Sequence, residues 1–339
     1  MTSLMNSVFK RLCDAARIPE TFVFLQRSDL LVLNYHGVLT HRRSNPERYV
    51  NEVDADSFRS QLRWLKRHLV PVGLEGLRDH SAGQWKQRKP PVLITFDDGY
   101  RNNLTVAAPI LLAEKVPAIF FLSTGYVGTP RVLWNDEVRV RVRNWPEPSI
   151  KLPSGETRDL PAKPRQRRAF SGNINQACKH LTEERLAEYL DYLRGNTSTV
   201  EIMDDPEARA FMNWDEAREL SRMGFEIGSH TVEHPILSQI SRERVVIELR
   251  ESKATIEREL DRPCPAIAYP NGSANDMNGA VLEEVRDAGY GWGFMTIPTW
   301  QKPDGDRHQI ARIGCPGHTN LATFKFYASG LHTRLSGTR

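Results

Sequence analysis

The stretch Val92-Leu93-Ile94-Thr95-Phe96-Asp97-Asp98-Gly99 decides the fold class of this chain. Its first five residues form an apolar run that is too short for a typical helix and rich in strand-forming side chains. The run ends at two adjacent carboxylates and a glycine. Because α/β folds build active sites at the carboxyl ends of buried parallel strands, this stretch predicts both a strand and a catalytic edge.

Segments typical of strands and helices alternate on both sides of this stretch. The predicted strands are Leu30 to Tyr35, Val92 to Phe96, Ala118 to Leu122, Phe225 to Gly228, Ala266 to Tyr269 and Gly291 to Thr296. The predicted helices are 54–69, 102–115, 214–223, 241–260 and 277–288. This repetition predicts an α/β fold with a parallel sheet, and the number of units favours a (β/α) barrel over an open sheet.

The alternation stops between Trp134 and Asn213, where several prolines interrupt a polar stretch before a helix expected at 182–194. We interpret 134–213 as an insertion between two parts of the barrel, 30–133 and 214–339, with a helical segment at 1–29. Residues 138–180 carry ten Lys or Arg against three Asp or Glu, a net charge of +7, although the whole chain carries only +4. Such a run is either a solvated face or a contact for phosphate groups of a substrate.

Composition narrows the class of protein further. The 339 residues include four widely spaced cysteines, which predict reduced thiols and neither a disulfide framework nor a zinc knuckle. No apolar run approaches a membrane span or the core of a secretory signal, so a cytoplasmic protein is expected. We expect no nucleic-acid partner. One alternative stays open, because the first helix has apolar residues at helical spacing with basic residues between them. It either packs on its own domain or lies on a membrane surface.

Two histidines four residues apart follow another predicted strand, in His230-Thr231-Val232-Glu233-His234. Residues at this spacing can share one face of a helical turn, so two imidazoles can hold one ion. The carboxyl ends of parallel strands converge, so these histidines are expected to meet the aspartates. Two neutral imidazoles and one carboxylate leave a position open for water, as in catalytic zinc sites.

A third strand ends in Tyr269-Pro270-Asn271-Gly272. Pro270 fixes the chain and Gly272 lets it turn, so the N–H of Tyr269 could face a pocket and stabilise an oxyanion. A plain β-turn with a packed tyrosine explains the local sequence equally well.

Taken in order, these three motifs resemble those of the NodB-homology polysaccharide deacetylases, carbohydrate esterase family 4, of the bacterial exopolysaccharide and glycolipid type. The resemblance covers 30–140 and 210–315 and implies a distorted (β/α) barrel that removes N-acetyl groups from sugars with a divalent metal, with zinc expected. It implies Asp98, His230 and His234 as metal ligands and Asp97 as general base. The metal would activate water and polarise the acetamide carbonyl while Asp97 takes the proton.

The chain departs from the family pattern at two places. Many members carry an arginine before the third motif that orients the base, but Pro265 stands there, so we expect Arg312 to take this role. The family's late histidine, often the general acid, has no clear equivalent; His318 is our choice, with His308 as the other candidate. We further expect substrate contacts from His36, Trp134, Pro270 and Asn271.

The sequence therefore predicts a metal-dependent sugar N-deacetylase whose substrate is a polysaccharide, lipid-linked or nucleotide-linked precursor. The basic insertion suits a phosphate-linked sugar. A metal-assisted amidase for a small non-sugar amide and a carbohydrate-binding relative without turnover are the alternatives.

Overall fold

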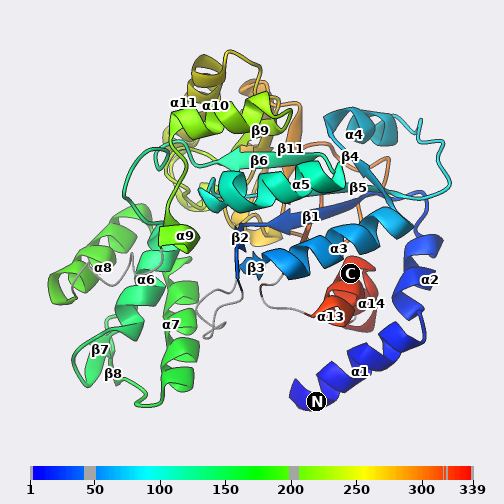
Figure 1. Cartoon of the computed structure of the whole chain (residues 1–339). Helices are drawn as coiled ribbons and strands as arrows, with labels where there is room; N and C mark the ends of the chain where they lie inside the picture. Colours follow the sequence, from blue (N-terminus) through cyan, green and yellow to red (C-terminus); the bar gives the residue numbers. More distant parts are fainter. Residues whose placement is uncertain (1–2, 42–50, 198–205, 316, 318–319, 337–339) are drawn as a thin grey trace.

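A curled, eight-stranded sheet forms the centre of the computed structural model, which describes residues 3–41, 51–197, 206–315, 317 and 320–336 (Figure 1). The order is β11-β10-β9-β6-β5-β1-β12, with β4 beside the first half of β5, and every pairing is parallel. The strands are β1 (Leu31–Tyr35), β4 (Val70–Val72), β5 (Pro91–Phe96), β6 (Ala118–Leu122), β9 (Glu226–Ser229), β10 (Ala266–Ala268), β11 (Trp292–Phe294) and β12 (Ile313–Gly314). The predicted distorted (β/α) barrel is confirmed.

The two ends of the sheet approach each other along residues 310–314. Ile310 bridges to Phe294 of β11, and three residues later Ile313 pairs with Leu33 of β1. Arg312 lies between these two pairings, just before β12. Residues 310–314 therefore place the Arg312 side chain on the inside of the curled sheet.

Alternation along each strand separates two faces. On β5, Ile94 and Phe96 pack in the large outer core, whereas Leu93 belongs to a smaller inner cluster. Residues two apart share a face, so Thr95 and Asp97 follow Leu93 on the inside. The helices that cover the outer face are α3 (Ala55–His68), α5 (Ala108–Glu114), α10 (Trp214–Arg222), α11 (Arg242–Leu260), α12 (Gly279–Asp287) and α13 (Leu321–Ala328) (Figure 1).

Side-chain caps explain why several helices begin where the sequence predicts. Asp54 accepts the N–H of Ser57 at the start of α3, and Asn213 forms a capping box with Glu216 at the start of α10. The helix expected at 102–115 is different: a π-helical turn at Asn103–Ala107 precedes α5. Pro109, in the first turn of α5, has no N–H to donate to the preceding turn, which accounts for the irregular hydrogen bonding there.

The insertion forms a small helical layer beside the barrel. It contains α6 (Trp134–Arg143), the hairpin β7 (Ser149–Lys151) and β8 (Thr157–Asp159), α7 (Pro164–Cys178), α8 (Glu183–Asn196) and α9 (Pro206–Arg209). Val138, Ile174 and Leu193 help to form its separate apolar core. Helix α7 lies where the sequence suggested an irregular stretch, because Pro164 occupies the first helical position, where proline is favourable. The division at 29, 133 and 213 stays our proposal.

The remaining elements lie at the termini and around the sheet. They are α1 (Ser3–Ala15), α2 (Ile18–Leu25), β2 (Gly37–Leu39), β3 (Glu52–Asp54), α4 (Leu74–Ser81) and α14 (Leu331–Ser336), with 3-10 turns at Leu237–Gln239 and Ala274–Asp276. Within the described part of the chain, no helix combines the length and apolar character needed to cross a membrane. All four cysteines are free and buried, as expected.

Candidate active site

Asp97 lies inside the curled sheet, directly after β5, and is held by two side chains. Arg312 donates from Nη1 to Oδ1 at 2.7 Å and from Nη2 to Oδ2 at 2.8 Å, and Asn34 of β1 donates from Nδ2 to Oδ2 at 3.0 Å. Arg312 is fully buried and also contacts Thr95 Oγ1 and the carbonyl of Met295. The predicted contact between Arg312 and Asp97 is present.

Asp98, His230 and His234 form a second cluster at the same edge, with one ligand atom from each lying within 4.8 Å of the others. Nε2 of His230 and Nε2 of His234 each lie 3.5 Å from Asp98 Oδ1. Ligand atoms bound to zinc at about 2.0–2.1 Å with tetrahedral angles lie about 3.3 Å apart, so the two distances from Asp98 to the imidazoles fit such an ion. The Nδ1 of His230 donates to the carbonyl of Ala268 at 2.7 Å, which orients the ring so that Nε2 faces Asp98.

Backbone turns bring these side chains together. Asp98 has φ of 75°, in the left-handed region, so the second aspartate turns away from the direction the strand would give it. Thr231 and His234 also have positive φ. The buried carboxylate of Glu248 on α11 accepts the N–H groups of Val232 and Glu233, which holds the histidine loop in this shape.

The charges of the site set its protonation. Burial alone would raise the pKa of Asp97, but Arg312 and His230 outweigh it and hold the pKa below its usual value. Burial likewise opposes ionisation of Asp98, yet hydrogen bonding to His230 and the charges of His36 and His234 keep its pKa low. Burial and the charge of His230 lower the pKa of His234 to about 4. Both carboxylates are therefore ionised at neutral pH, and His234 is neutral, as a metal ligand must be.

Tyr269 does not act as predicted. Its N–H donates to the carbonyl of Phe294 at 3.0 Å, within the pairing between β10 and β11, so it cannot bind an oxyanion. Its hydroxyl donates to the carbonyl of His308, and the side chain is buried. The predicted role of Tyr269 is wrong because strand pairing continues one residue past β10.

His308 lies at the wrong end of the sheet for the general acid. Its Nε2 lies 2.9 Å from the carbonyl of Tyr290, which precedes the amino end of β11. The cluster of Asp98, His230 and His234 lies at the carboxyl ends. His318 lies outside the described residues, so its role stays a prediction.

Comparison with known proteins identifies the family. The sequence model described as polysaccharide deacetylase matches residues 85–147 and 175–292, more than half of the chain. The chain belongs to the polysaccharide deacetylase family. This membership confirms the family resemblance that the motifs predicted.

Individual relatives are distant. The poly-beta-1,6-N-acetyl-D-glucosamine N-deacetylase of Escherichia coli K12 is 29% identical over 112 residues, which are 32% of this chain and 16% of that protein. The Streptococcus pyogenes deacetylase PplD, in complex with acetate, is similar in fold, with a TM-score of 0.57, 18% identity and coverage of 86% and 94% of the two chains. IcaB from Ammonifex degensii gives a TM-score of 0.57 at 19% identity, with coverage of 89% and 97%.

The other predicted substrate residues of this deacetylase family member lie around the cluster. His36 follows β1 at the same edge as Asp97, and its charge acts on both aspartates. Asn271 has φ of 60°, and its buried Nδ2 has no partner among the described residues. Pro270, the residue before it, is buried. Trp134 is 7% exposed and donates from Nε1 to the carbonyl of His234 at 3.4 Å, so it packs behind His234.

Sequence reasoning missed two residues of the site. Asn34 was counted only as part of an apolar strand, and Glu248 as part of a helix. A polar residue within an apolar strand is a usable signal, because a buried amide needs partners. Asn34 still has an unpartnered Oδ1 within the described structure.

Proposed function

We propose that this protein is a divalent-metal-dependent N-deacetylase of N-acetylated sugars. The observation that carries the proposal is the arrangement of two adjacent carboxylates with different environments. Asp97 is clamped by Arg312 and Asn34, whereas Asp98 faces two imidazole nitrogens. This division suits one proton acceptor and one metal ligand.

Asp98, His230 and His234 would hold the metal, and their donor set of two nitrogens and one oxygen favours zinc. When bound, the ion supplies an electrophile that polarises the amide carbonyl and makes water more acidic. Asp97 accepts the proton of the attacking water. Arg312 keeps the Asp97 carboxylate charged, and Arg312 and Asn34 together fix its orientation, so that it need not reorganise during proton transfer. The leaving amine requires a proton donor, for which His318 remains our candidate.

The substrate class is part of the proposal. The printed name of the E. coli relative specifies an N-acetylglucosamine polymer, which supports N-acetyl over O-acetyl groups. We propose a cytoplasmic glycan precursor carrying a phosphate link. Two of the basic residues in 138–180 hold the insertion together: Arg167 donates to three backbone carbonyls, and Arg141 is buried against Glu137. Phosphate contacts would therefore come from the others.

Acetate release tests the proposal directly. Purified protein should release acetate from N-acetylated sugars, and a chelator should abolish the release until zinc is returned. Asp98→Ala should lose both bound metal and activity, whereas Asp97→Asn should keep the metal and lose at least about 10²-fold in kcat. Full activity of Asp97→Asn would contradict the assignment of the base. Release of acetate only from a non-sugar amide would favour the amidase alternative, and metal binding without any release would favour a binding protein.

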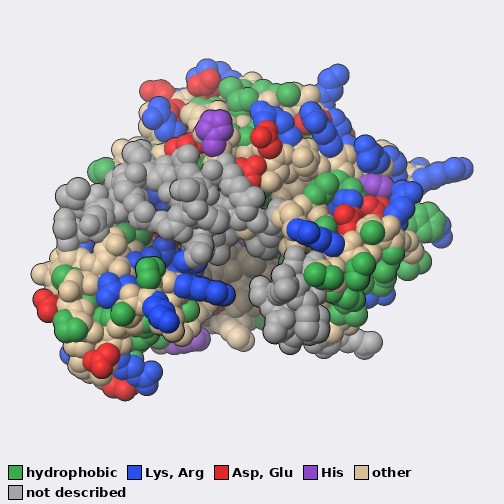
Figure 2. All heavy atoms as spheres, turned by 60° about the horizontal axis from the view of Figure 1, so that its bottom comes forward, with side chains coloured by type: hydrophobic (Ala, Val, Ile, Leu, Met, Phe, Trp, Pro, Cys, Tyr) green, Lys and Arg blue, Asp and Glu red, His purple; other side chains and the backbone are tan. Residues whose placement is uncertain are grey.

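Contact with an anionic membrane surface is a separate part of the proposal. Val8, Leu12, Phe24 and Leu25 of α1 and α2 are exposed, as is Leu335 of α14. Figure 2 shows hydrophobic side chains gathered beside Lys and Arg on one part of the surface. Arg11, Arg17 and Arg27 make no ion pair with any described residue, so they are positioned to meet lipid phosphates.

Sedimentation with vesicles tests this contact. The protein should bind anionic vesicles better than neutral ones, and Leu12→Glu should weaken binding several-fold. Leu112→Glu, a change at an exposed leucine of α5, is the matched control and should bind as the wild type does. Equal binding of both variants would contradict the proposal.

A further inference from the structure

A deep apolar pocket lies between the insertion and the barrel, beside the site but not part of it. We name it the junction pocket. Its volume is about 550 Å³, within the range of small-molecule sites. Twelve of its twenty lining residues are apolar, and they include Val132, Trp134, Leu186, Leu190, Ile236 and Ile240. None of Asp97, Asp98, His230 and His234 lines it.

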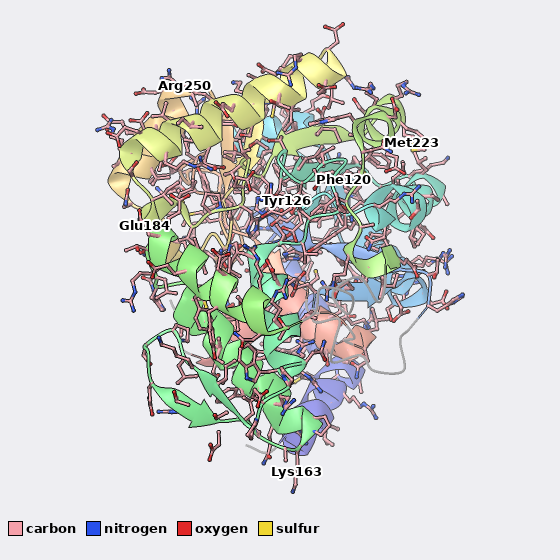
Figure 3. The ribbon with its side chains drawn as sticks, turned by 90° about the vertical axis from the view of Figure 1, so that its left-hand side faces the viewer. Phe120, Tyr126, Lys163, Glu184, Met223 and Arg250 are labelled. Atoms are coloured by element: carbon pink, nitrogen blue, oxygen red, sulfur yellow. The ribbon has the colours of Figure 1, made fainter. Side chains whose placement is uncertain are left out.

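The junction pocket shares a wall with the metal-binding cluster. Glu233 and Pro235, which flank His234 in sequence, both line it. Trp134 lines it too, and its Nε1 donates to the backbone carbonyl of His234. Figure 3 shows Tyr126, another lining residue, where the barrel meets the insertion. A ligand in this pocket would therefore end close to the cluster, with no part of it touching the metal ligands' side chains.

Most charged residues that line the pocket form ion pairs with one another. Arg131 forms a two-pronged ion pair with Glu233, and Arg141 and Arg194 both bind Glu137. Two charged residues remain. Glu183 is exposed at the start of α8.

Lys179 is different from the other cations. It is half-buried, and its ammonium makes no hydrogen bond or ion pair with any described residue. The charges of Asp276 and Arg139 act on Lys179 in opposite directions, and neither residue pairs directly with its ammonium. A partly buried lysine without a direct partner is costly, and an anionic ligand would offset that cost. Apolar walls and one unpaired ammonium together match an amphiphilic anion.

We propose that the junction pocket binds the apolar chain of a lipid-linked sugar phosphate, with the phosphate next to Lys179. This inference deepens the proposed function, since it names the lipid-linked class among its possible substrates. A nucleotide-linked sugar has no long apolar chain, so it would leave the walls of the pocket without a partner. The pocket therefore favours a lipid-linked over a nucleotide-linked substrate, a choice that the sequence motifs leave open.

Binding of simple probes tests the pocket without any turnover. Dodecyl phosphate, used as a monomer below its micelle concentration with chelator-treated protein, supplies chain and anion together. Dodecyl maltoside supplies a chain with a neutral head, and inorganic phosphate supplies the anion alone. We expect dodecyl phosphate to bind at least about tenfold more tightly than either of the others. Equal binding of inorganic phosphate and dodecyl phosphate would overturn the proposal.

Two matched pairs of variants locate the probe. Ala187→Phe places a ring in the pocket and should weaken both chain probes at least about tenfold, whereas Ala177→Phe, at an exposed alanine of α7 that does not line it, should not. Lys179→Gln should weaken dodecyl phosphate several-fold and leave dodecyl maltoside unchanged. Lys163→Gln, at the far tip of the insertion in Figure 3, is its control. Unchanged binding to Ala187→Phe would place the chain elsewhere, and equal effects of Lys179→Gln on both probes would overturn the phosphate contact.

Activity distinguishes failure of this proposal from failure of the proposed function. An N-acetyl sugar with a dodecyl phosphate link should have a lower KM than the same free sugar, and Ala187→Phe should remove this advantage while kcat on the free sugar stays unchanged. If Ala187→Phe leaves the advantage intact, the pocket proposal is wrong and the deacetylase proposal stands. If probes bind as expected but no acetate is released, the reverse holds.

Discussion

The inside of the barrel and the insertion both bury a carboxylate between nitrogen donors, yet they use it differently. Asp97 is held by Arg312 and Asn34, and Glu137 is held by Arg141 and Arg194. Beside Asp97 lie a second carboxylate and two imidazoles, whereas Glu137 lies beside the apolar core of the insertion. A buried ion pair by itself therefore does not mark an active site. What marks one is a second, incompletely satisfied group of ligands within reach of the first.

Removing Arg312 is expected to have the largest effect. Arg312→Met leaves Asp97 as an unpaired buried charge, which should lower the free energy of unfolding by about 3–5 kcal/mol. It should also lower kcat at least about 10²-fold, because the base loses its orientation. Urea denaturation and acetate release measure the two effects.

The double variant Arg312→Met, Asp97→Asn is the control for the first prediction. Neutralising the carboxylate should restore part of the stability without restoring activity, because the base is then missing. If Arg312→Met is as stable and active as the wild type, Asp97 and Arg312 are not coupled as the structure indicates.

The corresponding change in the insertion should be milder. Glu137→Gln keeps one acceptor for Arg141 and Arg194 but removes the charge, and Arg194 is half-exposed. We expect a loss of about 1–3 kcal/mol, confined to α6 and α8. Hydrogen exchange should show faster opening of these two helices, with the barrel strands unchanged. Equal loosening of β5 would show that the insertion and barrel unfold as one unit.

Lowering the pH should destabilise α6 and α8 before it destabilises the barrel. Burial alone would raise the pKa of Glu137, but hydrogen bonds and charge from Arg194 and Arg141 hold the pKa below its usual value. A lowered pKa in the folded state stabilises the fold above the unfolded value of about 4.3, and that stability is lost as the pH falls through the folded value. Exchange in α6 and α8 should therefore accelerate below about pH 4, and Glu137→Gln should flatten this dependence.

The comparison also explains what could be read from the sequence. The barrel strands carry short apolar runs that end at motif residues, so their positions and the meeting of Asp98 with the two histidines follow from local patterns and from the convergence of parallel strands. The Arg312 contact was expected only because the family resemblance implies an arginine beside Asp97. Contacts between distant segments leave no such trace. Nothing local indicates that the N–H of Tyr269 is taken by Phe294, or that His308 lies at the amino end of β11.

The insertion was harder to predict for a different physical reason. Proline signals a break within a helix but is favourable at its first position, so Pro164 concealed α7. The dense positive charge suggested a binding surface, yet Arg141 and Arg167 form contacts that hold the insertion together. Composition records how many charges a segment carries and not which of them already have partners.

The smallest expected effect lies at the contact between the two regions. The Trp134 indole donates to the His234 carbonyl at 3.4 Å, which is long for a hydrogen bond, and its ring fills the wall between pocket and cluster. Trp134→Phe keeps most of the apolar contact and removes the donor, so we expect a loss of less than about 1 kcal/mol and a change in kcat of less than about threefold. Trp134→Ala removes the wall itself and should cost about 3–5 kcal/mol. If Trp134→Phe instead lowers metal affinity strongly, the hydrogen bond to His234 positions the ligand, and the insertion takes part in building the site rather than only flanking it.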